Sequence, residues 1–248
     1  MAKYETEKAL LLKGVNRFTG AYLAGGALTS VFTRQPINDY DIYFKTEAAF
    51  RDAVEQAYDD GMWCVDASKR AVTFADGNSA VYQLMHFGFF PEVSDIFAAF
   101  DFTCCMGAYD FDKGEMILHD DFLTHCSQRF LRFNPGTKYP LATAVRVLKY
   151  QERGYSIGKG DMTRIALACR RVPIGSWDDL KDQIGGAYGD KVMLAASGEF
   201  SMDAAIAALN SDELWTKSTE DQPSTAEGLL IKLDKMRAGD VTPLPAAA

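Results

Sequence analysis

The spacing of apolar positions along the chain alternates between that of helices and that of strands. Amphipathic helices are expected over residues 3–17 and 47–58, the second with Thr46 as its N-cap and Gly61 as its stop. Short apolar or alternating runs predict strands at residues 62–66, 69–75 and 79–87. The turn residues 76–78, Asp-Gly-Asn, join the last two strands as a hairpin.

After this region the pattern is mainly helical. Pro91 opens a short helix, and Ser201 and Ser224 are suitable N-caps for two later ones. The helices are expected at residues 92–99, 140–155, 178–184, 191–196, 202–210 and 226–236.

The most informative stretch is residues 21–44, where an apolar run ends in a glycine pair and a polar spacer leads into an acidic strand. Gly25 and Gly26 let the backbone turn tightly and approach a ligand closely, because neither has a Cβ. Asp39 and Asp41 are two residues apart on the predicted strand, so their side chains share a face with Cα atoms roughly 6.5–7 Å apart. Such a pair of carboxylates can hold one or two hard divalent cations. The alternative is a solvated strand face beside an ordinary turn.

This order of glycine turn, spacer and acidic strand resembles the opening of the DNA polymerase beta-like nucleotidyltransferases. The match is to the head domain of poly(A) polymerases and class II CCA-adding enzymes, whose pattern GG-x-V-R-D, L-L-G-R-x-P, D-x-D reads here GGALTS, VFTRQP, DYD. The resemblance implies that Asp39 and Asp41 hold two Mg²⁺ ions and that Gly25, Gly26 and Ser30 cradle the phosphates of an NTP. Thr29 and Ser30 stand where the family has Arg-Asp, so hydroxyl groups would have to replace that arginine.

A second match to the same family lies at residues 100–121, where D-F-T, A-Y-D and an apolar strand ending in aspartate follow in order. The resemblance implies that Asp101 faces the nucleotide sugar or acts as a third carboxylate. Phe100 stands where the family has an arginine. The predicted strand that could carry a third metal ligand offers Gln83 instead of an acid, so either Asp101 takes that role or the site works with two carboxylates. The alternative is a helix and hairpin with incidental acids.

A third, shorter match covers residues 140–155, where Arg146 and Lys149 stand at arginine positions of the family. The resemblance implies that this segment contacts the incoming nucleotide, although the acidic pair that precedes the family's arginine is replaced by Ala142-Thr143. On a helix, Arg146, Lys149 and Arg153 share one face, for which a solvated surface is the alternative.

Charge limits the partners of the chain. The net charge of −8 excludes broad wrapping of nucleic acid, yet residues 139–171 carry seven basic and two acidic side chains. This distribution predicts a localised anion site. The five cysteines are an odd number with no zinc-ligand spacing, so we expect buried thiols and neither disulfides nor zinc.

The sequence thus predicts an α+β head at residues 1–136, with a nucleotidyltransferase-type mixed sheet and flanking helices, then a helical neck-like domain at 137–240 and a loose tail at 241–248. No apolar run is long enough for a membrane span and no signal peptide is visible, so a cytoplasmic protein is expected. The resemblance implies Mg²⁺-dependent transfer from an NTP to a hydroxyl acceptor, first of all a short RNA 3′ end. Two alternatives remain: modification of a protein or small molecule, and a catalytically silent nucleotide-binding protein.

Overall fold

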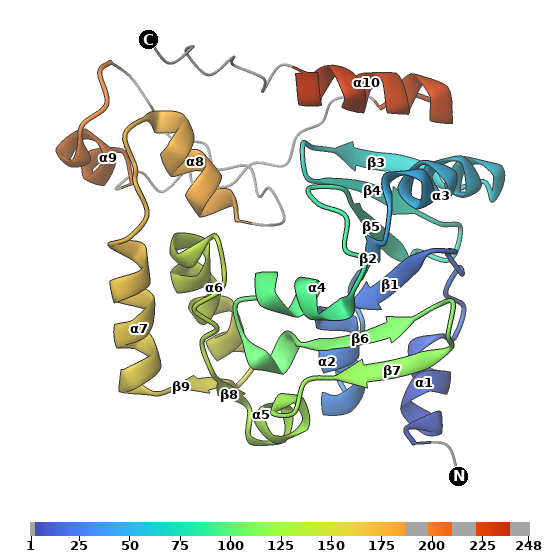
Figure 1. The fold of residues 1–248 in the computed structure, drawn as a ribbon, viewed down its shortest axis with the longest axis horizontal. Coiled ribbons are helices and arrows are strands. Elements are labelled where there is room, and N and C mark those ends of the chain that lie inside the picture. Colours follow the sequence, from blue (N-terminus) through green and yellow to red (C-terminus); the bar gives the residue numbers. More distant parts are fainter. Residues whose placement is uncertain (1–2, 187–197, 210–221, 239–248) are drawn as a thin grey trace.

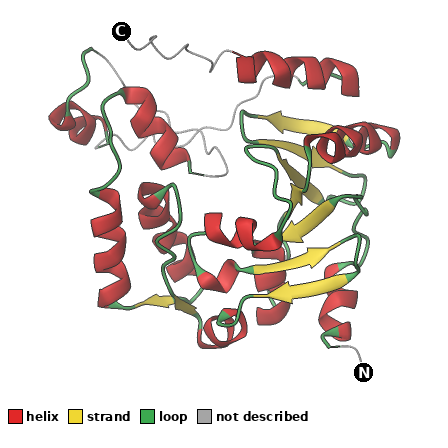
Figure 2. Ribbon diagram, viewed as in Figure 1, coloured by secondary structure: helices red, strands yellow, loops and turns green. Residues whose placement is uncertain are grey.

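A computed structural model describes residues 3–186, 198–209 and 222–238 (Figure 1). The expected helix at 191–196 and the expected tail at 241–248 lie outside these residues. The described chain is α+β, with helices flanking a mixed sheet and further helices after it, which confirms the expected fold class (Figure 2).

The sheet has seven strands in the order β3-β4-β5-β2-β1-β6-β7. Within this sheet, β2 and β5 are the one parallel pair among the described strands, and α3 and the β3–β4 hairpin form the crossover between them. The strands are β1 Ala21–Ala24, β2 Tyr40–Phe44, β3 Trp63–Ala67, β4 Ala71–Ala75, β5 Val81–Met85, β6 Gly107–Asp110 and β7 Glu115–Leu118. A separate two-stranded sheet pairs β8 Phe130–Leu131 with β9 Ser156–Ile157.

Helices surround the sheet in Figure 1: α6 to α9 lie to the left of its strands, α5 lies below β7 at one edge, and α10 lies above β3 at the other. They are α1 Glu5–Leu11, α2 Gly26–Thr33, α3 Glu47–Asp59, α4 Val93–Ala99, α5 Phe122–Gln128, α6 Pro140–Glu152, α7 Lys159–Cys169, α8 Trp177–Gly185, α9 Met202–Ala208 and α10 Ala226–Ala238. None of these described helices combines the length and apolarity needed to cross a bilayer.

Local sequence signals explain several of these boundaries. The Thr46 hydroxyl accepts a hydrogen bond from the Ala49 amide at 3.2 Å and caps α3 as expected. The helix predicted over residues 3–17 is shorter and ends at Leu11, and the chain then turns at Gly14 with a φ of 72°. At α10 the expected cap is wrong, since Thr225 rather than Ser224 accepts the amide hydrogen bond, from Gly228 at 3.2 Å.

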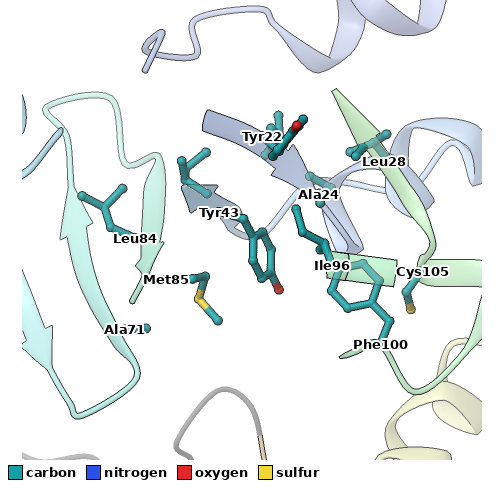
Figure 3. Close-up of a cluster of buried hydrophobic side chains, with 14 of the residues drawn as sticks. Tyr22, Ala24, Leu28, Tyr43, Ala71, Leu84, Met85, Ile96, Phe100 and Cys105 are labelled. Atoms are coloured by element: carbon teal, nitrogen blue, oxygen red, sulfur yellow. The ribbon is translucent and has the colours of Figure 1, made fainter. Parts of the chain in front are cut away.

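One hydrophobic core extends through the sheet and its helices, and part of it is drawn in Figure 3. Tyr43 on β2 lies there beside Phe100, with ring centroids 5.8 Å apart. The same core includes Val147 and Tyr150 of α6 as well as Leu229 and Leu233 of α10. It therefore continues across the boundary expected at residue 136, and the division of the chain into two domains stays a prediction. A smaller cluster joins α8 to α9 through Leu180, Ile184 and Ala205.

Candidate functional site

The central strand of the sheet, β2, positions the expected acid pair. Its register places Asp41 opposite Ala24 of antiparallel β1 and opposite Gln83 of parallel β5. Cross-strand partners share a face, so the Gln83 side chain lies beside the acids. Its Nε2 donates a hydrogen bond to Oδ2 of Asp39 at 3.0 Å. An amide thus stands where a third carboxylate could have been.

Asp41 is a buried acid with an unsatisfied oxygen. Its side chain belongs to a residue only 6% exposed, and Oδ1 has no hydrogen-bond partner within the described chain. Burial and the nearby charge of Asp39 raise the pKa of Asp41 well above its usual value, while Arg146 and Lys149 oppose that rise. A buried carboxylate without a partner is destabilising, so the arrangement requires a compensating cation or proton.

The glycine turn packs directly against this acid. Gly25 has a φ of 85°, and a Cβ added there would lie 3.4 Å from Oδ2 of Asp41 and 3.6 Å from the Phe100 ring. A Cβ at these distances would make ordinary contacts, so it is the positive φ that favours glycine at this position. The chain can therefore bring the start of α2 close to the carboxylate.

The residues present fit a cation that brings its own ligands. Mg²⁺ is often bound by one or two carboxylates together with substrate phosphates and water, which is what Asp39 and Asp41 can offer. The unsatisfied Oδ1 of Asp41 is the observation that favours such an ion. Within the described residues, no three or more His, Cys, Asp or Glu side chains gather as a metal cluster, so a protein-only cage is not formed there.

Asp101 has a different partner. Its Oδ2 lies 3.2 Å from Nη1 of Arg146, and its main-chain oxygen accepts a hydrogen bond from the Asn134 amide at 2.8 Å. Asp101 is 5% exposed, whereas the Arg146 side chain is 26% exposed, so a buried carboxylate is paired with a half-buried guanidinium. The structure does not gather Asp101 with Asp39 and Asp41 into a three-acid metal group. Its expected contact with a nucleotide sugar stays a prediction.

Two of the expected phosphate contacts are already used inside the protein. The Gly25 amide donates to the Gly107 carbonyl at 3.0 Å, and the Thr29 hydroxyl lies 2.8 Å from the Cys104 carbonyl. Neither group is free to contact a ligand in this arrangement. The amide of Gly25 therefore does not make the phosphate contact that was expected of it. The first amides of α2, from Gly26 onwards, have no acceptor within the helix by its geometry and point out of its N-terminus. Ser30 follows one turn later.

A small pocket of about 130 Å³, here called the α2 pocket, lies along this helix. Gly26 and Ser30 line one side, and Arg129, Arg153 and Tyr155 line the other. Arg129 donates from Nη1 to the Arg153 carbonyl at 2.6 Å, and neither arginine has an acidic partner in the described chain. The Tyr155 hydroxyl is buried without a hydrogen-bond partner there. Two arginines without an acidic partner among the described residues, together with an unsatisfied hydroxyl, make this pocket suitable for an anion.

The structure also divides the basic segment of the sequence. Arg146 and Lys149 of α6 lie near enough to Asp41 to lower its pKa, whereas Arg153 lines the α2 pocket. No sequence motif surrounds Arg129, so its place in this pocket could not be predicted. It joins Arg153 only because α5 ends beside the C-terminus of α6, a relationship that local sequence does not report.

Two solved structures illustrate what the fold is similar to. A Thermotoga maritima CCA-adding enzyme complexed with tRNA matches at 14% identity and a TM-score of 0.49, over 73% of this chain and 46% of that one. A tRNA nucleotidyltransferase with a primer tRNA and an ATP analogue matches at 14% identity and a TM-score of 0.48, over 93% and 60%. At such low identity and TM-score, nothing about the chemistry of this chain follows from them.

Sequence comparison is more specific. A protein named "Gabija anti-defense 2" from Bacillus phage SPbetaL7 is 41% identical over 169 residues, which is 68% of this chain. The match covers only 42% of that relative's length, so the activity of the whole relative is not carried over. A family profile described as "Gabija anti-defense 2 family protein" matches residues 2–129, which is more than half of the sequence and contains the acid pair and the glycine turn. The chain therefore belongs to the Gabija anti-defense 2 family.

Proposed function

We propose that this chain is a Mg²⁺-dependent nucleotidyltransferase that moves a nucleoside monophosphate from an NTP to a hydroxyl acceptor. The observation that carries the proposal is the buried carboxylate of Asp41, which has an unsatisfied oxygen, lies beside Asp39 and abuts the turn at Gly25. A carboxylate in this state binds a cation more readily than a solvated one, because the ion removes both the burial penalty and the repulsion between the acids.

Each group has a separate task in this proposal. Asp39 and Asp41 would hold the metal, which when bound neutralises charge on the phosphates of the substrate. Gly26, Ser30 and the arginines of the α2 pocket would bind and orient the β and γ phosphates. The acceptor hydroxyl loses its proton to water, its oxygen bonds to the α-phosphorus as the bond from that phosphorus to the bridging oxygen breaks, and pyrophosphate leaves. Positioning and charge neutralisation suffice, so no protein nucleophile is required.

The acceptor that we propose is an RNA 3′ end. Support comes from α6, which brings Arg146 and Lys149 to the acid pair and could hold a short strand by a few phosphate contacts. The net charge of −8 argues against a larger RNA surface. Since the relative is named an anti-defense protein, we further propose that the transfer acts against the defence named Gabija.

The test uses each α-phosphate-labelled NTP with Mg²⁺ and three separate pools: total RNA, soluble protein and small metabolites. We expect label in RNA, with none when Asp41→Asn replaces the wild type. Label that enters only protein or metabolites would replace the RNA acceptor with the corresponding class. If a folded protein transfers label to none of the three pools, the proposed nucleotidyltransferase activity is refuted.

A second candidate function is nucleotide binding without turnover. It is favoured by the pairing of Asp101 with Arg146 and by Gln83 beside the acids, which together leave two carboxylates for the metal. Under this alternative, Mg²⁺ with ATP raises the melting temperature of the wild type but not of Asp41→Asn, and no label is transferred to any acceptor.

A further inference from the structure

The molecule has a second pocket that the proposed reaction does not use. It has a volume of about 490 Å³ and is lined by residues of α7, of α8, of the loop at residues 133–139 with the first residue of α6, and of the segment at residues 171–173. Figure 1 shows α7 and α8 on the left of the molecule, away from the seven-stranded sheet. None of the residues assigned above to the acids, the glycine turn or the α2 pocket lines this second pocket. We call it the α7–α8 pocket. Its volume falls within the range of ordinary small-molecule sites, ~300–1,000 Å³.

The lining of the α7–α8 pocket combines apolar walls with positive charge. Phe133, Pro135 and Leu167 are among the apolar residues, and Leu167 is 59% exposed although it is large and aliphatic. The charged residues are all basic: Lys138, Arg164 and Arg171.

This charge is only partly neutralised. Arg164 lies 3.6 Å from the buried Asp161, which also binds Arg132 at 3.3 Å. Neither Lys138 nor Arg171 has an acidic partner within the described residues. In a chain of net charge −8, such a cluster favours an anionic ligand.

Gln183 of α8 lines the same pocket and has one unsatisfied polar atom. Its Nε2 donates a hydrogen bond to the Lys138 carbonyl at 2.9 Å, which leaves Oε1 as the free acceptor. Oε1 is buried and has no partner in the described chain, and the residue is only 8% exposed. A buried acceptor of this kind needs a donor, since leaving it unpaired costs free energy.

Together these features define the ligand by its chemistry. It must carry an N–H donor for Gln183, an apolar ring for the walls, and an anionic group for the basic side chains. A nucleotide has all three in one molecule. We propose that the α7–α8 pocket binds a nucleotide unit, with its base against the apolar wall near Gln183 and its phosphate near Lys138 and Arg171. The unit could belong to a free nucleotide or to an RNA strand, and the experiment separates these sources.

The test measures binding by calorimetry to the full chain in EDTA, so that the acid pair holds no metal. The probes are AMP, adenosine, inorganic phosphate and a three-nucleotide RNA. We expect AMP to bind more tightly than adenosine or phosphate, because only AMP fills both the apolar and the basic parts. Preference for the RNA over AMP identifies a strand as the source, and equal or tighter binding of AMP identifies a free nucleotide.

Variants locate the binding. Arg171→Glu should weaken AMP binding by about tenfold or more, because it reverses a charge at the phosphate. Arg170→Glu is the matched control. Arg170 is adjacent to Arg171 in the sequence and is also exposed, but it does not line the pocket, so AMP binding should change by about twofold at most. Gln183→Leu should weaken AMP binding while leaving phosphate binding unchanged. A circular dichroism spectrum confirms that each variant is folded.

The proposal is overturned if wild-type protein binds no AMP in EDTA, or if Arg170→Glu and Arg171→Glu have equal effects. Loss of AMP binding in Asp39→Asn/Asp41→Asn would also overturn it, because the binding would then belong to the acid pair. Persistence of AMP binding in that double variant supports the second site even if no nucleotidyl transfer is ever detected. Failure of one proposal is thus distinguishable from failure of the other.

Discussion

Nη1 of Arg146 lies 3.2 Å from Oδ2 of Asp101, and this ion pair links α6 to the segment that precedes the short helical turn Thr103–Cys105. Arg146 is thus the partner of Asp101, the acid for which the family resemblance suggested a role as a third carboxylate. The pair also places a cation close enough to oppose the raised pKa of Asp41. Arg146 therefore lies near two acids: it forms an ion pair with Asp101, and its charge opposes the raised pKa of Asp41, for which we propose a metal ion as the ligand.

The first prediction concerns this ion pair. Arg146→Ala should destabilise the protein by about 3 kcal/mol, because it leaves the buried Asp101 carboxylate without its charge partner. The combined variant Asp101→Asn/Arg146→Gln should recover part of that loss, since no buried charge remains. Urea denaturation of the three proteins measures the effect. Equal stability of wild type and Arg146→Ala would show that the pair is not structural.

The second prediction separates stability from activity at Asp41. Because burial and Asp39 raise its pKa, the charged carboxylate opposes folding, and the destabilisation grows as the pH rises through the folded-state pKa. Asp41→Asn should therefore raise the melting temperature at pH 7 in EDTA while abolishing transfer. Asp59→Asn, at an exposed position of α3, should change neither. A melting temperature lowered by Asp41→Asn would refute this account of its environment.

The third prediction tests the α2 pocket. Arg129→Glu and Arg153→Glu should each raise the KM for NTP by about tenfold or more, because a charge-assisted contact to phosphate becomes a repulsion. Lys235→Glu, an exposed position on α10, makes the same change of net charge and should have no such effect. Steady-state kinetics at fixed Mg²⁺ gives the comparison. Equal effects of all three substitutions would point to overall charge instead of this pocket.

The fourth prediction concerns the attachment of α10. Arg237 donates from Nη2 towards Nδ1 of His86 at 3.1 Å, and Nε2 of the same histidine faces the Ser68 carbonyl at 3.0 Å. The imidazole is thus neutral, and burial, with the charge of Arg237, lowers the pKa of His86 from 6.5 to about 4. The unfolded chain binds the proton more readily, so stability is greatest above pH 6.5 and falls as the pH drops towards 4, by at most roughly 3 kcal/mol.

Thermal unfolding between pH 4.5 and 7.5 checks this sign. His86→Gln should flatten the profile, because the amide cannot take up the proton that the unfolded histidine binds. His119→Gln serves as the matched control and should retain the wild-type profile. A stability that rises on acidification through this range would contradict the assignment.

Much of the acid site was accessible from sequence, because its parts are local. Two aspartates at alternate positions of a strand share a face by backbone geometry, and a glycine pair between an apolar run and a polar segment marks a turn. The structure shows the expected apolar strand, glycine turn and acidic strand in that order, with Asp41 on β2 and Asp39 directly before it, whereas the stretch expected as a polar spacer begins with the helix α2. The caps at Thr46 and Ser201 were equally local, and both are observed.

The sequence by itself determined the α+β class, the acid pair and the concentration of positive charge between residues 139 and 171. Tertiary structure alone decided how the remaining side chains are paired. Thr29 turns into the core, Asp101 meets a helix 45 positions later in the chain, and Arg129 joins Arg153 at one pocket. Periodicity describes how neighbours along the chain share a face, whereas these relationships depend on which helices pack together. The physical reason is that burial and pairing are properties of the folded core, which no local pattern encodes.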